Sequence, residues 1–362
     1  MASGSSIPST RLGSLDQFRG YTVAAMFAVN FIGGYQNAPA LLRHHNTWCS
    51  FADTVMPQFF FAVGMALRLV MLREAEQHGP GAARKRAVRR GFLLLLIGIC
   101  WYHPGRDWES WAQLVATPWT EIVRDGFLTN AFQALTHIGA TTLWVVPVML
   151  AAPRWRLLFA AGSAALHLGL SHGFWYETLH RWGVIDGGPL GFLTWTLPVI
   201  AGTLAFDAVN AVSNTNPGLL RRMAMAAGLT MAGGYALACL TQGGSVAAPP
   251  FVPPWHAPDL WTMSQKAGSV SYLLFSTGFS LAVYAFFHWW SDRRGKSLRL
   301  FTDLGQNALA AYLIHMVIMG LLGHFGPKDA PLWWATLLSA GGCWLSWQAT
   351  RWLNARRLFL RL

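Results

Sequence analysis

The chain has 362 residues, of which 53% are hydrophobic and only 12% are charged. A soluble domain carries about 25% charged residues, so this composition excludes a disordered chain, a fibrous repeat and an ordinary soluble enzyme. The formal net charge of +12 comes from basic residues placed between apolar runs, and no nucleic-acid-binding motif accompanies them. The composition therefore indicates a polytopic membrane protein.

Apolar runs of about 20 residues, the length needed to cross a bilayer, recur along the whole chain. They predict an all-α membrane protein of about ten transmembrane helices, forming a single domain over residues 1–362 with a polar N-terminal tail over 1–15. This tail does not have the pattern of a cleavable signal peptide. The runs fall at 18–36, 51–73, 90–104, 127–151, 155–175, 190–212, 223–242, 268–290, 303–325 and 332–353.

Basic residues are distributed unevenly between the two sides of this arrangement. One side holds 21 of the 27 Lys and Arg residues, many of them in the connection 74–90, and the other side holds Arg43, Arg106, Arg124, Arg181, Lys266 and Lys328. The positive-inside rule places the basic side, and with it both termini, in the cytoplasm. The far side has longer segments rich in Trp, Pro and Gly, which suit either aromatic belts or irregular backbone over a cavity.

Polar side chains near membrane depth are candidates for function. Asp16 and Arg19 are spaced to pair on a helix, either as an ion pair at the helix start or with Arg19 holding an anionic cytosolic ligand. Asn30 lies deep in the first run, just before Gly33 and Gly34. It either joins helices by hydrogen bonds or faces a cavity where the helix ends.

The segment RHHNTWCSFAD, before the second run, delivers His44, His45, Trp48 and Asp53 within a short stretch. Asp53 opens an apolar helix, which it can partly cap. A histidine bonded to a carboxylate is a general-base arrangement, and we expect His45 to be oriented by Asp53. A surface-loop histidine and a metal ligand are the alternatives, although no HxxxH or HExxH pattern is present.

The ninth run contains LGQNALAAYLIH. On a continuous helix Asn307 and His315 share one face, and Tyr312 lies beside His315. The two interpretations are polar packing between helices and the lining of a cavity.

Taken in order, these segments resemble the transmembrane acyltransferases of the heparan-α-glucosaminide N-acetyltransferase family and its bacterial relatives. RLGSLDQFRGYTVAAMFAVNF resembles the family pattern R..S.D.FRG.....M..VN, and LGQNALAAYLIH resembles G.NAL..Y...H. HNTWCSFADTVMPQFFFAVG resembles H..W.G....D...P.F.F..G, with a shorter segment between Trp48 and Asp53. Weaker similarities follow at FQALTHIGATTLWVVP, DGGPLGFLTWTLPVIAGTLAFD and PDLWTMSQKAGSVSYLLFSTGFSL.

The resemblance implies an inner-membrane enzyme that transfers an acetyl group from cytosolic acetyl-CoA, used as co-substrate without a metal. The acceptor is then an amino sugar or a saccharide hydroxyl of the cell envelope, on the extracytoplasmic side. The resemblance maps the family's catalytic histidine to His45 and its companion asparagine to Asn30. His45 would act as general base or as a transient acyl carrier, and Asn30 would stabilise the thioester oxygen.

Two further groups of residues are expected around this centre. Basic and polar groups on the cytoplasmic side would bind the acyl-CoA: Arg19, Asp16, Arg89, Arg90 and Asn307. Aromatic and histidine side chains would line the acceptor cavity: Trp48, His44, Trp261, Tyr312 and His315.

A transporter or flippase for a sugar or a lipid-linked saccharide is the competing class, because broken helices and buried polar groups suit it equally well. The sequence leaves open the identity of the acceptor, N- or O-acylation, the acyl chain length and the oligomeric state, a homodimer included.

Overall fold

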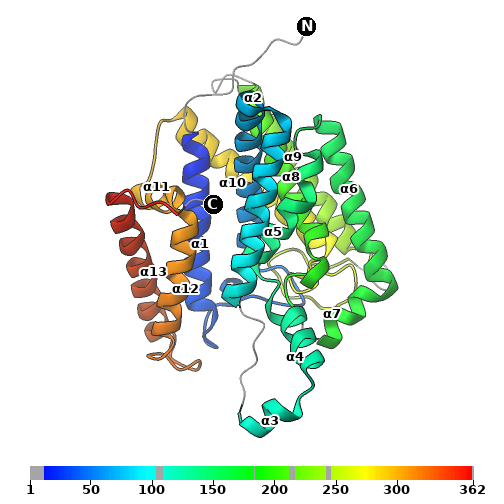
Figure 1. The fold of residues 1–362 in the computed structure, drawn as a ribbon, viewed down its shortest axis with the longest axis vertical. Helices are drawn as coiled ribbons and strands as arrows, with labels where there is room; N and C mark the ends of the chain where they lie inside the picture. Colours follow the sequence, from blue (N-terminus) through cyan, green and yellow to red (C-terminus); the bar gives the residue numbers. More distant parts are fainter. Residues whose placement is uncertain (1–11, 103–108, 183, 212–216, 242–245, 361–362) are drawn as a thin grey trace.

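The computed structural model describes residues 12–102, 109–182, 184–211, 217–241 and 246–360, and within these ranges the chain is helical with no β-strand. The longer helices run roughly along one axis, and α3, α4 and α7 lie at one end of the bundle (Figure 1). The helices are α1 (Gly13–Gly33), α2 (Phe51–Tyr102), α3 (Trp111–Ala116), α4 (Trp119–Asp125), α5 (Ala134–Val145), α6 (Pro153–Leu170), α7 (Tyr176–Trp182), α8 (Phe192–Asn210), α9 (Pro217–Ala238), α10 (Val270–Phe287), α11 (Arg299–Gln306), α12 (Ala308–Leu322) and α13 (Leu332–Ala355).

Four helical segments of the described chain are long and apolar enough to cross a membrane: Phe51–Tyr102, Pro153–Arg181, Gly188–Asn210 and Val270–Arg293. The pair α11–α12 makes a fifth if it is counted as one broken span. The prediction of an all-helical protein with membrane-spanning character is therefore confirmed. The number of ten crossings and the cytoplasmic location of both termini stay predictions. Residues 1–11 of the polar tail, Arg106 and the end of the third predicted run lie outside the described residues.

The second and third predicted runs are the two halves of α2, which turns back at Gly79. This glycine has φ +85°, a left-handed conformation that glycine adopts without steric cost, and Pro80 follows it. Glu74 and Arg86 form an ion pair across the turn, although they would be about 18 Å apart on a straight helix. The connection 74–90, expected as a loop, is helical apart from this turn because Ala, Arg, Lys and Glu are good helix formers.

The first half of α2 packs directly on α8. A Cβ atom at Gly64 would lie 2.0 Å from the carbonyl oxygen of Val199, and one at Gly202 would lie 2.1 Å from that of Phe61. Small residues allow such close contact between membrane helices, where lipid supplies no hydrophobic driving force for association. The contact fixes the start of α2, where Asp53 lies, relative to the loop that precedes α8.

The ninth predicted run is not one continuous helix. Its backbone leaves the helical conformation at Asn307 (φ −132°, ψ 44°), and α11 and α12 meet at 97°. The Asn307 side chain donates to the carbonyl oxygen of Leu358 (2.8 Å) and accepts from the backbone N–H of Leu360 (3.1 Å). The expectation that Asn307 shares a helical face with His315 is therefore wrong, because Asn307 lies at the break and binds the C-terminal segment.

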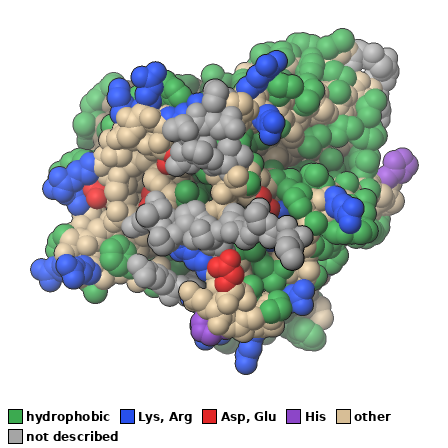
Figure 2. Space-filling view, turned by 90° about the horizontal axis from the view of Figure 1, so that it is seen from above, with side chains coloured by type: hydrophobic (Ala, Val, Ile, Leu, Met, Phe, Trp, Pro, Cys, Tyr) green, Lys and Arg blue, Asp and Glu red, His purple; other side chains and the backbone are tan. Residues whose placement is uncertain are grey.

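The two ends of the bundle differ in character. The loops before α2, before α8 and before α10 gather at the end where α4 and α7 lie (Figure 1). Figure 2 views the opposite end, where α1 begins, and Lys and Arg side chains are spread over it. The end where α1 begins therefore carries basic side chains, as the sequence predicts for that side.

Candidate active site

A histidine and a buried carboxylate pair at the start of α2. His44 Nδ1 and Asp53 Oδ1 are 2.8 Å apart. The Asp53 side chain is fully buried, whereas 46% of the His44 side chain is exposed. A buried acid that holds one nitrogen of an accessible imidazole leaves the other nitrogen oriented for proton transfer. The pair has the geometry of a general base.

Asp53 is held in place by a capping box with Ser50. The Ser50 backbone N–H and hydroxyl each donate to Asp53 Oδ2 at 2.9 Å, and the Asp53 N–H donates to Ser50 Oγ at 3.3 Å. Such reciprocal bonds satisfy N–H groups that a helix start leaves unpaired. The capping role predicted for Asp53 is confirmed, and its second oxygen remains for His44.

His45 does not pair with Asp53. Its Nε2 donates to the carbonyl oxygen of Ala40 (2.7 Å), and its ring stacks on Trp48 with 4.2 Å between centroids. The predicted His45–Asp53 pair is wrong by one residue. Counting back from Trp48 along the family pattern gives His45, but His44 is the histidine that meets the carboxylate.

The loop before α8 and the loop before α10 add a second acid, which the sequence analysis missed. Gln265 Nε2 donates to Asp186 Oδ1 at 2.8 Å, and Asp186 is 7% exposed. Burial lowers the pKa of His44, but its hydrogen bond to Asp53, the charges of Asp53 and Asp186 and an interaction with Gln265 outweigh burial, so the pKa is raised. Burial raises the pKa of Asp186 to about 6. The sequence signals for Asp186 were its place in the DGG turn and at the start of DGGPLGFLTWTLPVIAGTLAFD, one of the weaker family similarities.

The predicted companion residue Asn30 meets a different histidine. Asn30 Nδ2 lies 3.1 Å from Nε2 of the fully buried His315, on α12. One turn earlier on α12, the hydroxyl of Tyr312 bonds to that of Tyr102 at the end of α2. The sequence placed Asn30 with the catalytic residues, and Tyr312 and His315 with the acceptor cavity. The structure brings all three together.

The residues expected to bind acyl-CoA divide between two helices. α1 and α11 cross so closely that a Cβ atom at Gly305 would lie 2.0 Å from the carbonyl oxygen of Asp16. Asp16 and Arg19 are therefore near the break at Asn307, whose amide is occupied by the C-terminal segment. Arg89, exposed, and Arg90, half-buried, lie after the turn in α2.

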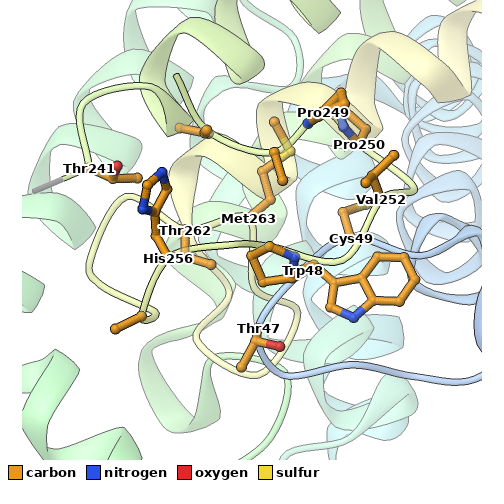
Figure 3. A pocket seen from close by; sticks show the side chains of 15 residues that line it. Thr47, Trp48, Cys49, Thr241, Pro249, Pro250, Val252, His256, Thr262 and Met263 are labelled. Carbon is orange, nitrogen blue, oxygen red and sulfur yellow. The ribbon is translucent and has the colours of Figure 1, made fainter. Parts of the chain in front are cut away.

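A pocket adjoins the segment that carries the histidines (Figure 3). Thr47, Trp48 and Cys49 form one side, and the loop before α10 forms most of the rest with Ala, Pro, Val and Met side chains. Neither His44 nor Asp53 is among the lining residues. Trp261, predicted to line the cavity, is half-buried next to the lining residues Thr262 and Met263.

A second charged cluster, also missed from the sequence, lies between α2, α6 and α8. Arg68 Nε donates to Asp207 Oδ1 at 2.9 Å, and Arg156 donates to the other oxygen of the same carboxylate. Arg68 also donates to the carbonyl oxygen of Met149, and Arg156 donates to Thr203 Oγ1 at 2.6 Å. Arg156 is fully buried. Within the described ranges, no group of three or more His, Cys, Asp and Glu side chains is arranged to hold a metal ion.

Residues 11–183 match the family model described as heparan-alpha-glucosaminide N-acetyltransferase, catalytic. The family resemblance is confirmed over this segment. It contains Asn30, His44, His45 and Asp53, whereas Asp186 lies three residues beyond it and Gln265 lies 82 residues beyond it. A comparison with curated proteins finds no match.

Proposed function

We propose that this protein is a membrane acetyltransferase that moves an acetyl group from cytosolic acetyl-CoA to an amino sugar or saccharide hydroxyl on the extracytoplasmic side. The observation that carries the proposal is the His44–Asp53 pair inside the segment that matches the family's catalytic domain. A transferase of this kind needs a base on the acceptor side, and His44 is half-exposed at the end of the bundle where the long loops gather.

In the proposed reaction His44 is the general base. The acceptor nitrogen or oxygen attacks the thioester carbonyl, His44 takes the proton from the attacking atom, and the C–S bond breaks to release CoA, whose thiolate takes up a proton. Asp53 holds Nδ1 and stabilises the imidazolium that forms. His45 is less suited to this role, since Ala40 and Trp48 already occupy its Nε2 and its ring face.

The donor side of the proposal uses the basic end of the bundle. Arg19, Arg89 and Arg90 supply positive charge for the CoA phosphates, with Asp16 and Asn307 at the crossing of α1 and α11. Asn30 donates its amide N–H to the thioester oxygen as negative charge develops there. This step requires Asn30 to exchange its bond to His315 for one to the substrate.

Thiol release from acetyl-CoA in proteoliposomes, with glucosamine as the acceptor, tests the proposal. General-base catalysis contributes about 10²–10⁴ in rate, so His44→Ala should lose that factor, while His45→Ala, the matched neighbour, should keep most of the rate. The reverse result would return the base to His45. If the folded wild-type protein shows no acceptor-dependent thiol release, the proposed acetyltransferase function is refuted.

A covalent route through an acylated histidine is the variant mechanism. Incubation with radiolabelled acetyl-CoA in the absence of acceptor separates the two routes, because only the covalent route leaves label on the protein. The His44→Ala and His45→Ala variants then show which ring carries it.

The broken helix α11–α12, bent by 97°, favours a transporter as the second candidate, since discontinuous helices build substrate sites in many carriers. Passage of a labelled sugar across the proteoliposome membrane without CoA release would support the carrier and exclude the enzyme.

A further inference from the structure

Three loops that are far apart in the sequence are bonded together around His44. The Ser264 hydroxyl donates to the carbonyl oxygen of Asn46 at 2.7 Å, which ties the loop before α10 to the histidine segment. The Gly187 N–H donates to the carbonyl oxygen of Lys266 at 2.9 Å, which ties the same loop to the turn before α8. Asp186 and Gln265 therefore approach His44 on a fixed frame.

The turn that carries Asp186 is held in an unusual conformation. Asp186 has φ +54°, Gly187 +80° and Gly188 +56°, and non-glycine residues rarely occupy this left-handed region. Two indoles hold the turn: Trp195 Nε1 donates to the Asp186 carbonyl oxygen at 2.9 Å, and Trp175 Nε1 donates to that of Gly187 at 3.3 Å. Backbone of this kind persists where the surrounding structure enforces it, often at functional sites.

The Asp186 carboxylate is buried, and a side chain rather than solvent meets it. Gln265 Nε2 donates to its Oδ1, and the residue before Gln265, Ser264, is bonded to Asn46, two residues after His44. An amide that gives its N–H to a carboxylate presents its carbonyl oxygen to the next donor, so Gln265 can transmit the orientation of Asp186 to the imidazole.

We propose that Asp186, acting through Gln265, is a positioning residue for His44, so that two acids rather than one orient the imidazole. Its catalytic consequence rests on the proposed acetyltransferase function, but its effect on His44 does not. Asp53 fixes Nδ1 from α2, while Asp186 and Gln265 act on the same ring from the two loops before α8 and α10. A base held from two sides keeps one orientation when the acceptor arrives.

Several charged and titratable groups surround His44 and can influence its pKa. Asp53 and Asp186 are the acids that act on it. Arg43 and His45 flank it in the chain, Lys266 follows Gln265, and the Tyr272 hydroxyl of α10 donates to the Asp53 carbonyl oxygen. Because the Asp186 charge raises the pKa of His44, removal of that charge alone should lower this pKa.

The test titrates His44 in the full-length protein in detergent. Diethyl pyrocarbonate reacts with neutral imidazole, and mass spectrometry reads its addition to His44 against pH in a His45→Gln background. Asp186→Asn keeps the left-handed turn accessible, because Asn tolerates that region, and should move the midpoint down by about one pH unit. Asp259→Asn, in the loop before α10, is the matched control and should leave it unchanged.

An unchanged midpoint in Asp186→Asn, with the thermal unfolding of the wild type retained, would overturn the proposal. In the thiol-release assay the base must be neutral, so the acidic limb of kcat/KM should move to lower pH in Asp186→Asn while kcat falls. If Asp186 had a purely structural role, the Asp186→Asn substitution would lower the maximum of kcat/KM without moving its acidic limb to another pH. If the wild type transfers no acetyl group, the modification experiment still decides the role of Asp186.

Discussion

Two clusters of this protein are built from the same ingredients, carboxylates with cationic or protonatable partners, but they differ in access. In the loop site, Asp53 is buried under a histidine whose side chain is 46% exposed. In the interior cluster, Asp207 joins Arg68 and the fully buried Arg156 across three helices. The first arrangement leaves a titratable ring accessible to reactants, whereas the second leaves no such ring.

This difference in exposure predicts different effects of substitution in the two clusters. A buried ion pair is costly to break because one partner is left charged and unpaired. Replacement of a half-exposed imidazole costs the folded state little stability, because water can occupy the space that the ring leaves. We therefore expect changes in the interior cluster to lower stability, and changes in the loop site to lower the rate of the proposed acetyl transfer with little effect on stability.

The largest expected stability effect is that of Asp207→Ala, which leaves Arg68 and Arg156 without their acid. Breaking a buried pair typically costs about 3–5 kcal/mol, measured here as a fall in the thermal unfolding midpoint in detergent. Asp125→Ala is the matched control, since its exposed pair with Arg124 should contribute at most about 1 kcal/mol. A stable but inactive Asp207→Ala protein would make the interior cluster part of the active site and break the comparison.

Asp53→Asn should act on the rate rather than on the fold. The amide can still accept from the Ser50 N–H, but it can also donate to His44 Nδ1, which forces the proton onto Nε2 and removes the base. We expect a loss of about 10²-fold or more in kcat, read by thiol release, with the unfolding midpoint close to that of the wild type. A wild-type rate would show that His44 works without its carboxylate.

Ser50→Ala tests whether the capping box supports the site or only the helix. Loss of a helix cap costs about 1 kcal/mol, so a modest fall in the unfolding midpoint is expected. Because Asp53 loses the hydroxyl and keeps the backbone N–H, acetyl transfer should fall less than in Asp53→Asn. Equal losses in both variants would mean that the Ser50 hydroxyl, rather than its backbone N–H, holds the acid.

Tyr312→Phe is expected to have the smallest effect. It removes the hydroxyl bond to Tyr102 in the interior, and a hydrogen bond of this kind contributes about 1 kcal/mol. The unfolding midpoint should fall slightly, and the pH dependence of the transfer rate should not move. A shifted pH dependence would connect the interior tyrosines to the loop site.

Much of this architecture is readable from local patterns. The apolar runs predicted helices because burial of backbone groups in lipid requires internal hydrogen bonds. The ordered motifs predicted a family resemblance, which the match over residues 11–183 confirms for that segment. The capping of α2 by Asp53 also follows from a local pattern, since the N–H groups that it satisfies lie within one turn of it.

The sequence by itself determined the helical membrane character, the family resemblance of the first half of the chain and the short stretch that supplies the histidines and Asp53. Tertiary structure alone decided which histidine meets the acid, since adjacent residues differ only in the direction their side chains take from a loop. It also decided the break at Asn307. Asp186 and Gln265, which bond to each other although they are 79 residues apart in the chain, were brought toward His44 by tertiary structure as well. Contacts between distant loops depend on helix packing, and no local pattern encodes them.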